Sequence, residues 1–187
     1  MTTPAKLDSV LIDDFVTSFP NGKEWEKLPC SKIGELTKNG KYTWKNIEHL
    51  KGKGAVYAFY LPASFFASAR TIHLHGSKGS KIPFEFNLTA EPGDDKVIVY
   101  IGRTSKLGQR FAAHLRKGAR QASAQVKYGQ MDSGICVDQT SALDFIRQHG
   151  LVVYRILDNP EQTANRDIIE ICLCARYRPP FNIKSER

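Results

Sequence analysis

Two short runs of almost wholly apolar and aromatic residues restrict the possible folds of this chain more than any other feature of its sequence. Residues 55–61 (AVYAFYL) are followed by Pro62, and residues 97–101 (VIVYI) are followed by Gly102. Apolar runs of this length, rich in β-branched and aromatic residues and bounded by proline or glycine, are typical of buried strands. The sequence therefore predicts a sheet that contains both segments, with the second strand ending at Gly102.

The segments around these strands predict a hairpin, a further strand and several helices. Residues 72–75 and 84–88 alternate in polarity on either side of a Gly/Ser/Lys-rich turn, and residues 151–157 form another apolar run. Helical spacing or capping residues mark further segments, at residues 10–16, 107–117, 142–149 and 164–177. This order predicts an α/β protein of the α+β type, with a small, mainly antiparallel central sheet flanked by helices and an inserted hairpin.

The length of 187 residues suits one domain with an N-terminal extension. A Lys/Gly-rich break at residues 51–54 separates the extension, residues 1–50, from a domain at residues 51–187, into which about residues 62–96 are inserted. Large apolar side chains are expected to pack the extension onto the domain, namely Trp25, Leu28, Ile33, Leu36 and Trp44.

The chain carries a large excess of positive charge. It has 27 Lys and Arg residues against 19 Asp and Glu residues, which gives a formal net charge of +8. Such an excess favours a polyanionic partner, because a protein that neutralises phosphates releases the counterions condensed on them. A basic protein without such a partner would have the same composition, so charge alone leaves both interpretations open.

Cysteine usage and the N-terminal segment indicate the cellular compartment. The cysteines match neither a disulfide framework nor a zinc-binding pattern, and they stand at positions 30, 136, 172 and 174. The N-terminal residues lack the pattern of a signal peptide, and no stretch is long and apolar enough to cross a bilayer. We therefore expect reduced thiols, no membrane association and a cytoplasmic location.

Glu170 is the most anomalous residue of the sequence. It lies in residues 167–175 (DIIEICLCA), a predicted helix that is apolar nearly all round. An ionised carboxylate in such surroundings is costly unless a partner compensates its charge. An ion pair with an arginine, or an exposed seam on the helix, would explain it. Coordination of a hard divalent cation is the alternative explanation.

Basic and aromatic residues gather around the second predicted strand and the helix that follows it. Arg110 and His114 are one helical turn apart and therefore project as neighbours, and Arg103 stands at the exit of the strand. Arginine suits phosphate because its planar guanidinium can donate two hydrogen bonds at once. Tyr57 and Tyr100 lie on the two predicted strands, where an isolated tyrosine is ordinarily a core residue.

In order and spacing, these residues resemble the motifs of the GIY-YIG nuclease family. Residues 100–102 (YIG) match the second motif, and residues 55–57 (AVY) match the first. The other motif positions follow in the family's order: Arg110 and His114 on one helix, Glu170 on a late apolar helix, and Asn182 in the terminal element. The resemblance covers about residues 54–182 and implies the fold of that family.

The chain also departs from the family pattern. Ala-Val-Tyr replaces Gly-Ile-Tyr, although Gly54 directly precedes it. About forty residues separate the two motifs where the family usually has a short hairpin turn, so Tyr60 is the alternative to Tyr57. Arg103 stands where the family often has lysine, and arginine holds phosphate well but cannot accept a proton.

The resemblance implies hydrolysis of phosphodiester bonds in DNA with Mg²⁺, or Mn²⁺, bound by Glu170. The metal would act as a Lewis acid and stabilise the leaving group. Arg110 would donate to a non-bridging phosphate oxygen, and Arg103 would help to bind the phosphate.

The resemblance also assigns roles to the remaining motif residues. Tyr57 would act as general base on the attacking water, or would position it. For a base of this kind, either a nearby cation must lower the pKa of Tyr57, or its proton must pass on to His114. Tyr100 would hydrogen-bond the phosphate or the water, and Asn182 would brace the site.

Among nucleases, the compact chain resembles a type II restriction endonuclease that cuts double-stranded DNA at a short site. Recognition would then come from residues 1–50, 62–96 and 121–139. Such enzymes often act as homodimers on DNA, because one site cuts one strand. A structure-specific repair or phage-type nuclease is the alternative enzyme, and a non-catalytic nucleic-acid-binding module is the alternative outside catalysis.

Overall fold

The computed structural model describes residues 7–36, 42–63, 71–75, 81–85, 96–115, 146–159, 162–179 and 182. Along these residues the elements follow in the order α1 (Ser9–Ser18), β1 (Glu26–Pro29), α2 (Cys30–Ile33), β2 (Gly34–Leu36), β3 (Tyr42–Trp44), η1 (Glu48–Leu50), β4 (Ala55–Pro62), β5 (Thr71–His75), β6 (Lys81–Glu85), β7 (Lys96–Thr104), α3 (Leu107–Leu115), β8 (Leu151–Ile156) and α6 (Thr163–Tyr177). Several predicted features lie outside the described residues: positions 116–117 and 142–145 of two helices, positions 86–88 of the hairpin, segment 121–139 and Cys136.

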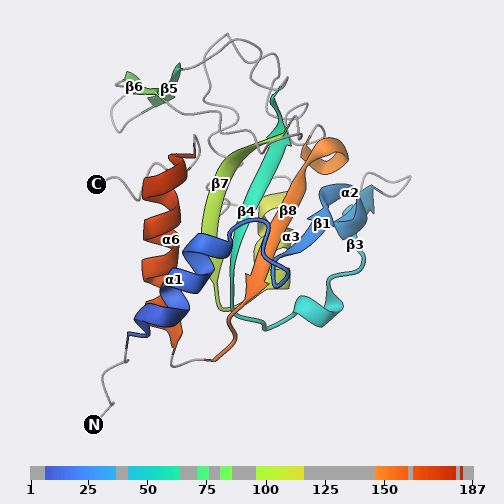
Figure 1. The fold of residues 1–187 in the computed structure, drawn as a ribbon. Helices are drawn as coiled ribbons and strands as arrows, with labels where there is room; N and C mark the ends of the chain where they lie inside the picture. Colours follow the sequence, from blue (N-terminus) through green and yellow to red (C-terminus); the bar gives the residue numbers. More distant parts are fainter. Residues whose placement is uncertain are drawn as a thin grey trace.

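Four strands form the central sheet in the order β1-β8-β4-β7, and every neighbouring pair is antiparallel. In Figure 1, β4 and β8 occupy the centre and β7 forms the edge next to α6. The predicted small, mainly antiparallel sheet with flanking helices is therefore confirmed, and β4 and β7 arise from the two apolar runs. Between them the chain forms the antiparallel hairpin β5–β6, whose second strand lies at Lys81–Glu85, three residues earlier than predicted.

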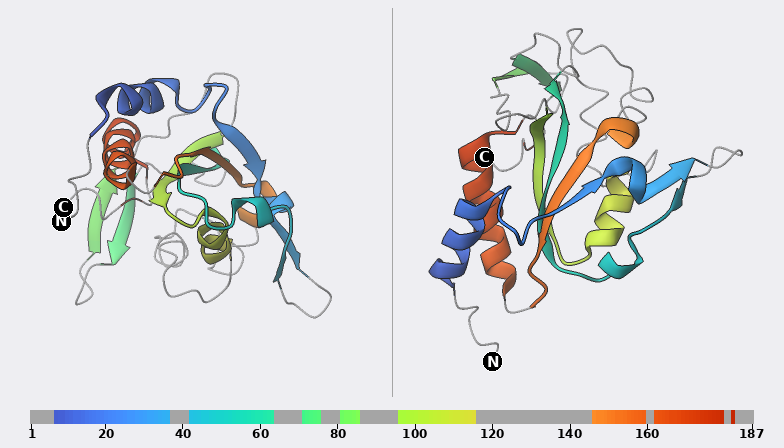
Figure 2. Two further views of the ribbon diagram at one scale, coloured as in Figure 1. Left: turned by 90° about the horizontal axis from the view of Figure 1, so that it is seen from below. Right: turned by 45° about the vertical axis from the view of Figure 1, so that its right-hand side comes forward.

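Helices cover both faces of the sheet, and each face has its own apolar core. On one face Tyr57 of β4 packs in a cluster with Phe111 of α3. On the other face Val56 packs in a cluster with Phe15 of α1 and Ile169 of α6. Figure 2 shows α1 and α6 together on one side of the sheet and α3 on the other. Successive strand side chains point to opposite faces, so burial of both faces explains why β4 is apolar at every position.

A β-bulge in β7 interrupts this alternation just before the YIG segment. Phe59 pairs with Tyr100, whereas the next residue, Tyr60, pairs with Ile98, so the register skips Val99. As a result, Val99 and Tyr100 both pack in the core that faces α3. Without the extra residue, Tyr100 would point toward α6. The bulge therefore turns Tyr100 to the face that carries Tyr57.

β7 continues past Gly102, the residue predicted to end it, as far as Thr104. Gly102 pairs with Tyr57, and Arg103 pairs with Val56. Glycine weakens a strand because its backbone is so free. In this position, pairing with the central strand β4 outweighs that local preference, and the predicted strand end was wrong.

Residues 7–50 contribute a strand to the central sheet. β1 pairs with β8, and β2 and β3 pair with each other, although the sequence analysis predicted none of these strands. Among the predicted anchors, Trp25 and Ile33 are buried, and Leu28 and Trp44 pack partly buried against the core. The side chain of Leu36 lies outside what the structure describes.

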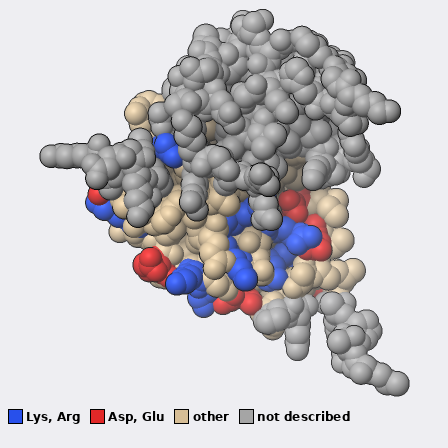
Figure 3. All heavy atoms as spheres, turned by 180° about the vertical axis from the view of Figure 1, so that it is seen from behind, with Lys and Arg blue, Asp and Glu red and all other residues tan. Residues whose placement is uncertain are grey.

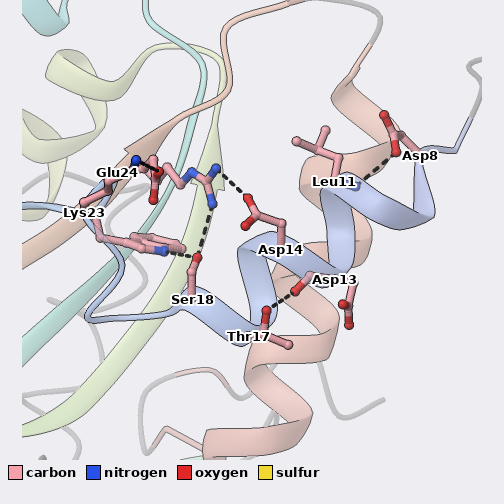
Figure 4. A network of polar contacts seen from close by, with 10 residues as sticks. Asp8, Leu11, Asp13, Asp14, Thr17, Ser18, Lys23 and Glu24 are labelled. Atoms are coloured by element: carbon pink, nitrogen blue, oxygen red, sulfur yellow. Dashed lines mark hydrogen bonds and ion pairs between the residues drawn. The ribbon is translucent and has the colours of Figure 1, made fainter.

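The predicted helix near residues 10–16 is α1. Hydrogen bonds join its ends and its side chains to α6 and β8. Asp8 caps it, since its carboxylate accepts from the backbone N–H of Leu11 at 3.0 Å. The backbone N–H of Asp8 donates to Asn165 of α6 at 3.1 Å. Arg155 of β8 donates to the Asp14 carboxylate at 2.7 Å and to Ser18 Oγ at 3.2 Å, contacts drawn in Figure 4. The N-terminal segment thereby supports the helix that carries Glu170.

α6 ends immediately before the proline pair at positions 179 and 180, as predicted. Arg178 adopts a left-handed conformation with φ of 44°, and its backbone N–H donates to the Cys174 carbonyl, a common way for a helix to end. Cys174 and, in α2, Cys30 are buried, and Cys172 is partly buried. No helix in the described parts of the chain combines the length and the apolar character of a membrane span.

Candidate active site

A hydrogen-bonded trio joins the centre of the sheet to α3. The Tyr57 hydroxyl lies 2.9 Å from Nε2 of His114, and it accepts a hydrogen bond from Nε of Arg110 at 3.1 Å. Tyr57 is fully buried and His114 is buried, whereas Arg110 is partly exposed. Arg110 and His114 both reach β4 because residues four apart share one face of a helix. The fold thus brings three predicted site residues into direct contact.

Tyr100 joins this cluster because the bulge turns it toward Tyr57. Its ring centroid lies 6.0 Å from that of Tyr57 and 5.0 Å from that of His114. Gly102 lies beside both phenol rings: a Cβ at this position would stand 2.7 Å from Tyr57 Oη and 2.7 Å from Tyr100 Cε1. Glycine in the YIG segment therefore leaves the room that the two tyrosines occupy.

The buried Tyr57–His114 pair is neutral. Burial, reinforced by the charge of Arg110, lowers the pKa of His114 to about 3. Burial, followed by the neighbouring Tyr100, raises the pKa of Tyr57 well above its usual value, although Arg110 opposes this shift. The tautomer of the neutral imidazole sets the direction of the Tyr57–His114 hydrogen bond, and an imidazole with an unprotonated Nε2 accepts from the phenol. The 2.9 Å contact with His114 provides a path for the Tyr57 proton, and Arg110 acts in the direction of the other route, because its charge and its hydrogen bond lower the pKa of Tyr57.

Glu170 and Asp167 face Arg103 from α6. Nε of Arg103 lies 2.5 Å from Oδ1 of Asp167 and 3.3 Å from Oε2 of Glu170. Burial raises the pKa of Glu170 to about 7, against the charge of Arg103 and, more weakly, of Arg110, while Asp167 adds to the increase. The positive neighbours therefore do not fully compensate the buried carboxylate.

Arg110 connects the Tyr57 cluster with the Glu170 carboxylate. It donates to Tyr57, interacts with Tyr100, and its positive charge also acts on Glu170. The nuclease interpretation requires Glu170 to lie near Arg110 and Tyr100; Arg110 interacts with Tyr100, and its charge acts weakly on Glu170, which pairs directly with Arg103. The candidate site thus lies at the C-terminal end of β7, with α3 on one face of the strand and α6 on the other.

The side chain of Asn182 forms hydrogen bonds with the backbone at the edge of β7. Its Oδ1 accepts from the backbone N–H of Ile101 at 2.7 Å, and its Nδ2 donates to the carbonyl of the same residue. Two bonds to the backbone of one residue replace the partners that a further strand would supply at an edge. The bonded residue, Ile101, directly follows Tyr100 in the chain. This position suits the bracing role that the resemblance implies for Asn182.

The surroundings of Glu170 suit a magnesium ion. Mg²⁺ usually takes one or two protein carboxylates and completes its shell with water and substrate phosphate. Glu170 offers a hard carboxylate oxygen on a side chain that is 22 % exposed. In the described parts of the chain, no group of three or more His, Cys, Asp or Glu residues is placed to hold a metal. Water and a phosphate oxygen would complete the coordination.

Tyr57 and its alternative, Tyr60, lie on opposite faces of the sheet. The two tyrosines are three residues apart in β4, so their side chains point to opposite faces, and Tyr60 packs in the core of α1 and α6.

Asp167 was not among the site residues predicted from the sequence. Its spacing of one helical turn from Glu170 is a signal that could have indicated it.

Basic and acidic side chains lie close together on the face opposite to the view of Figure 1. Figure 3 shows blue Lys and Arg spheres gathered there with red Asp and Glu spheres among them. The side chain of Arg103, 40 % exposed, and the exposed Lys106 flank the end of β7.

Compared with known proteins, the chain matches no family model, no curated protein and no solved structure.

Proposed function

We propose that this chain is a Mg²⁺-dependent DNA endonuclease that hydrolyses phosphodiester bonds, acting as a type II restriction endonuclease. One observation carries the proposal: Arg110 donates to the buried Tyr57, which contacts His114, and the charge of Arg110 also acts on Glu170. A guanidinium that is hydrogen-bonded to a proton relay, and whose charge acts on a carboxylate with a raised pKa, suits a reaction in which a phosphate gains charge.

In the proposed reaction, Arg110 and Arg103 orient the scissile phosphate, and Arg110 stabilises the charge that develops on its non-bridging oxygens. Both arginines reach the surface, so a phosphate has access to them. Preorganised donors of this kind supply much of the stabilisation of a transition state. Tyr100 adds a hydroxyl near the same guanidinium.

Tyr57 and His114 form the proposed path for the proton of the attacking water. As the Tyr57 oxygen takes that proton, its own proton moves to Nε2 of His114, 2.9 Å away. The pKa of His114 is low partly because of the charge of Arg110. A phosphate bound to Arg110 offsets that charge, so substrate binding makes His114 a better proton acceptor. Tyr57 is fully buried, so a water reaches its oxygen after Arg110 shifts toward the phosphate.

Glu170 would hold Mg²⁺, or Mn²⁺, against the scissile phosphate. When bound, the ion supplies Lewis acidity to the phosphate and stabilises the leaving oxygen. Glu170 suits this role because its carboxylate is partly exposed and incompletely compensated by its positive neighbours.

The proposal includes double-stranded DNA as substrate, a homodimer on DNA and a cytoplasmic location. The net charge of +8 favours a polyanionic substrate. One set of Tyr57, Arg110 and Glu170 cuts one strand, so a second copy of the chain would be needed to cut both strands in one encounter. Residues 62–96 and 121–139, which would contribute to recognition, lie largely outside the described residues.

A cleavage assay on supercoiled plasmid tests the proposal. With Mg²⁺ we expect discrete fragments whose ends share a short sequence, and with EDTA we expect intact plasmid. Glu170→Ala should abolish cleavage, whereas Glu24→Ala, at an exposed position, should cleave like the wild type. Arg110→Ala should slow the reaction by about 10²–10³-fold, the scale of a lost oxyanion donor.

Other outcomes of the same assay would replace the proposal. Nicks confined to junctions would indicate a structure-specific nuclease. DNA binding without any product, in Mg²⁺ or Mn²⁺, would indicate a non-catalytic binding module. A Glu170→Ala variant with the turnover of the wild type would refute the metal assignment.

A further inference from the structure

Two carboxylates of α6 share the guanidinium of Arg103. Asp167 and Glu170 stand three residues apart on the helix and therefore project from the same face. Nε of Arg103 lies 2.5 Å from Asp167 and 3.3 Å from Glu170, so the ion pair with Asp167 is the closer one. α6 packs along β7, which brings Arg103, one residue after the YIG segment, against both carboxylates.

Arg103 is a competitor for any cation that Glu170 binds. The Arg103 guanidinium, 3.3 Å from Glu170 Oε2, occupies one approach to that oxygen, and its positive charge repels a metal ion there. The outcome of this competition depends on how often Arg103 pairs with Asp167 rather than with Glu170. A second carboxylate that holds Arg103 at shorter distance lowers the occupancy of the Arg103–Glu170 pair.

We propose that Asp167 is a positioning residue that competes with Glu170 for Arg103 and so makes the Glu170 carboxylate more available to a divalent cation. The inference rests on the proposed function, because it assumes that Glu170 is the metal ligand. It adds a residue that the motif resemblance does not include.

The exposures of the three side chains support this role over a structural one. The side chains of Arg103 and Asp167 are 40 % and 38 % exposed, although the Asp167 Oδ1 that faces Arg103 is itself buried, whereas the side chain of Glu170 is 22 % exposed. An exposed ion pair contributes little to stability. Its effect on the neighbouring, more buried carboxylate is larger, because charges interact more strongly where less water screens them.

Removal of the Asp167 charge is expected to release Arg103 to Glu170. The Asp167→Asn side chain keeps its size but binds the guanidinium more weakly, so Arg103 then pairs with Glu170 and excludes the cation. Arg103→Gln removes the competitor altogether. In the double variant, Asp167→Asn with Arg103→Gln, no guanidinium is left to redirect, so loss of the Asp167 charge should have little further effect.

The test is Mn²⁺ binding to the free full-length protein, measured by the enhancement of water-proton relaxation, with no DNA present. Asp167→Asn should bind Mn²⁺ about two- to five-fold more weakly than the wild type, the scale of one partly exposed ion pair. Arg103→Gln and the double variant should bind at least as tightly as the wild type. Asp13→Asn, which removes the same charge from an exposed position of α1, should bind like the wild type.

Two results would overturn the inference. Asp167→Asn with wild-type affinity would show that Asp167 does not direct Arg103. A double variant as weak as Asp167→Asn would show that Asp167 acts on the cation directly, without Arg103.

Glu170→Gln distinguishes failure of the inference from failure of the proposed function. If Glu170→Gln loses Mn²⁺ binding and Asp167→Asn does not change it, only the role of Asp167 fails. If Glu170→Gln binds Mn²⁺ like the wild type, the metal assignment fails and the role of Asp167 fails with it.

Discussion

Gly102→Ala tests the geometry of the candidate site most directly. A Cβ at this position would stand 2.7 Å from Tyr57 Oη, 2.8 Å from Tyr57 Cζ and 2.7 Å from Tyr100 Cε1. Ordinary contact begins at 3.4 Å, so either the tyrosine rings or β7 must move by about 0.7 Å. Tyr57 has little freedom to move, because it is fully buried and its hydroxyl contacts Arg110 and His114.

The expected cost is that of overpacking a buried site, about 1–3 kcal/mol in the free energy of unfolding. The backbone of Gly102 contributes nothing to this cost, because its φ lies outside the left-handed region and an alanine adopts it without strain. A shift of the Tyr57 ring by about 0.7 Å away from His114 would lengthen their 2.9 Å contact beyond ordinary hydrogen-bonding distance. We therefore expect cleavage to fall further than stability alone explains.

Urea denaturation and plasmid cleavage check this prediction together. Tyr57→Phe supplies the matched background, because it removes the Oη contact and leaves the ring. In a double-mutant cycle, Gly102→Ala should cost less in the Tyr57→Phe background than in the wild type, with a coupling of about 0.5 kcal/mol or more. Equal costs in both backgrounds, or a Gly102→Ala protein as stable as the wild type, would refute the packing of Gly102 against Tyr57.

Further predictions concern protonation and the edge of β7. Because burial raises the pKa of Glu170 to about 7, its ionisation destabilises the fold as pH rises from the unfolded value near 4.5 through 7. Glu170→Gln should therefore be more stable than the wild type above pH 7 by about 1–3 kcal/mol, measured by urea denaturation; equal stability at pH 8 would contradict it. The folded-state pKa of His114 is about 3, so its ring resonances should not titrate between pH 5 and 8, and its contribution to stability should be present above pH 6.5 and decline toward pH 3; an imidazole that titrates near pH 6.5 in NMR spectra would contradict this. Asn182→Ala removes both bonds to Ile101 and should cost about 1–3 kcal/mol; unchanged hydrogen exchange at the Ile101 amide would show that the bond does not hold that edge.

Much of the fold could be predicted because β4 and residues 97–101 of β7 are apolar at every position. β4 and β7 arise from residues 55–61 and 97–101, and only a sheet buried on both faces accommodates such runs. Helix α6 has its end marked by consecutive prolines, which local chemistry alone explains. β1 escaped prediction because its residues, Glu26–Pro29, have no strand-like pattern of their own and owe their conformation to pairing with β8.

The candidate site could be predicted by residue type but not by geometry. The order and spacing of Tyr57, Tyr100, Arg110 and Glu170 indicated the members of the site. Asp167 was missed because an aspartate on a helix usually has a solvated surface role, and its contact with Arg103 requires α6 to pack along β7. The strand end at Gly102 was predicted wrongly, because a ladder with β4 outweighed the local preference of glycine.

By itself, the sequence determined which segments become buried strands and helices, since periodicity and capping act between neighbours along the chain. Only the tertiary structure decided which way Tyr100 points, because one extra residue in the pairing of β7 with β4 reverses the face of every side chain that follows. It also decided that the Tyr57–His114 pair is neutral and that Glu170 has a raised pKa. Those properties depend on how much water and how many charges surround each group, and distant parts of the chain supply those surroundings.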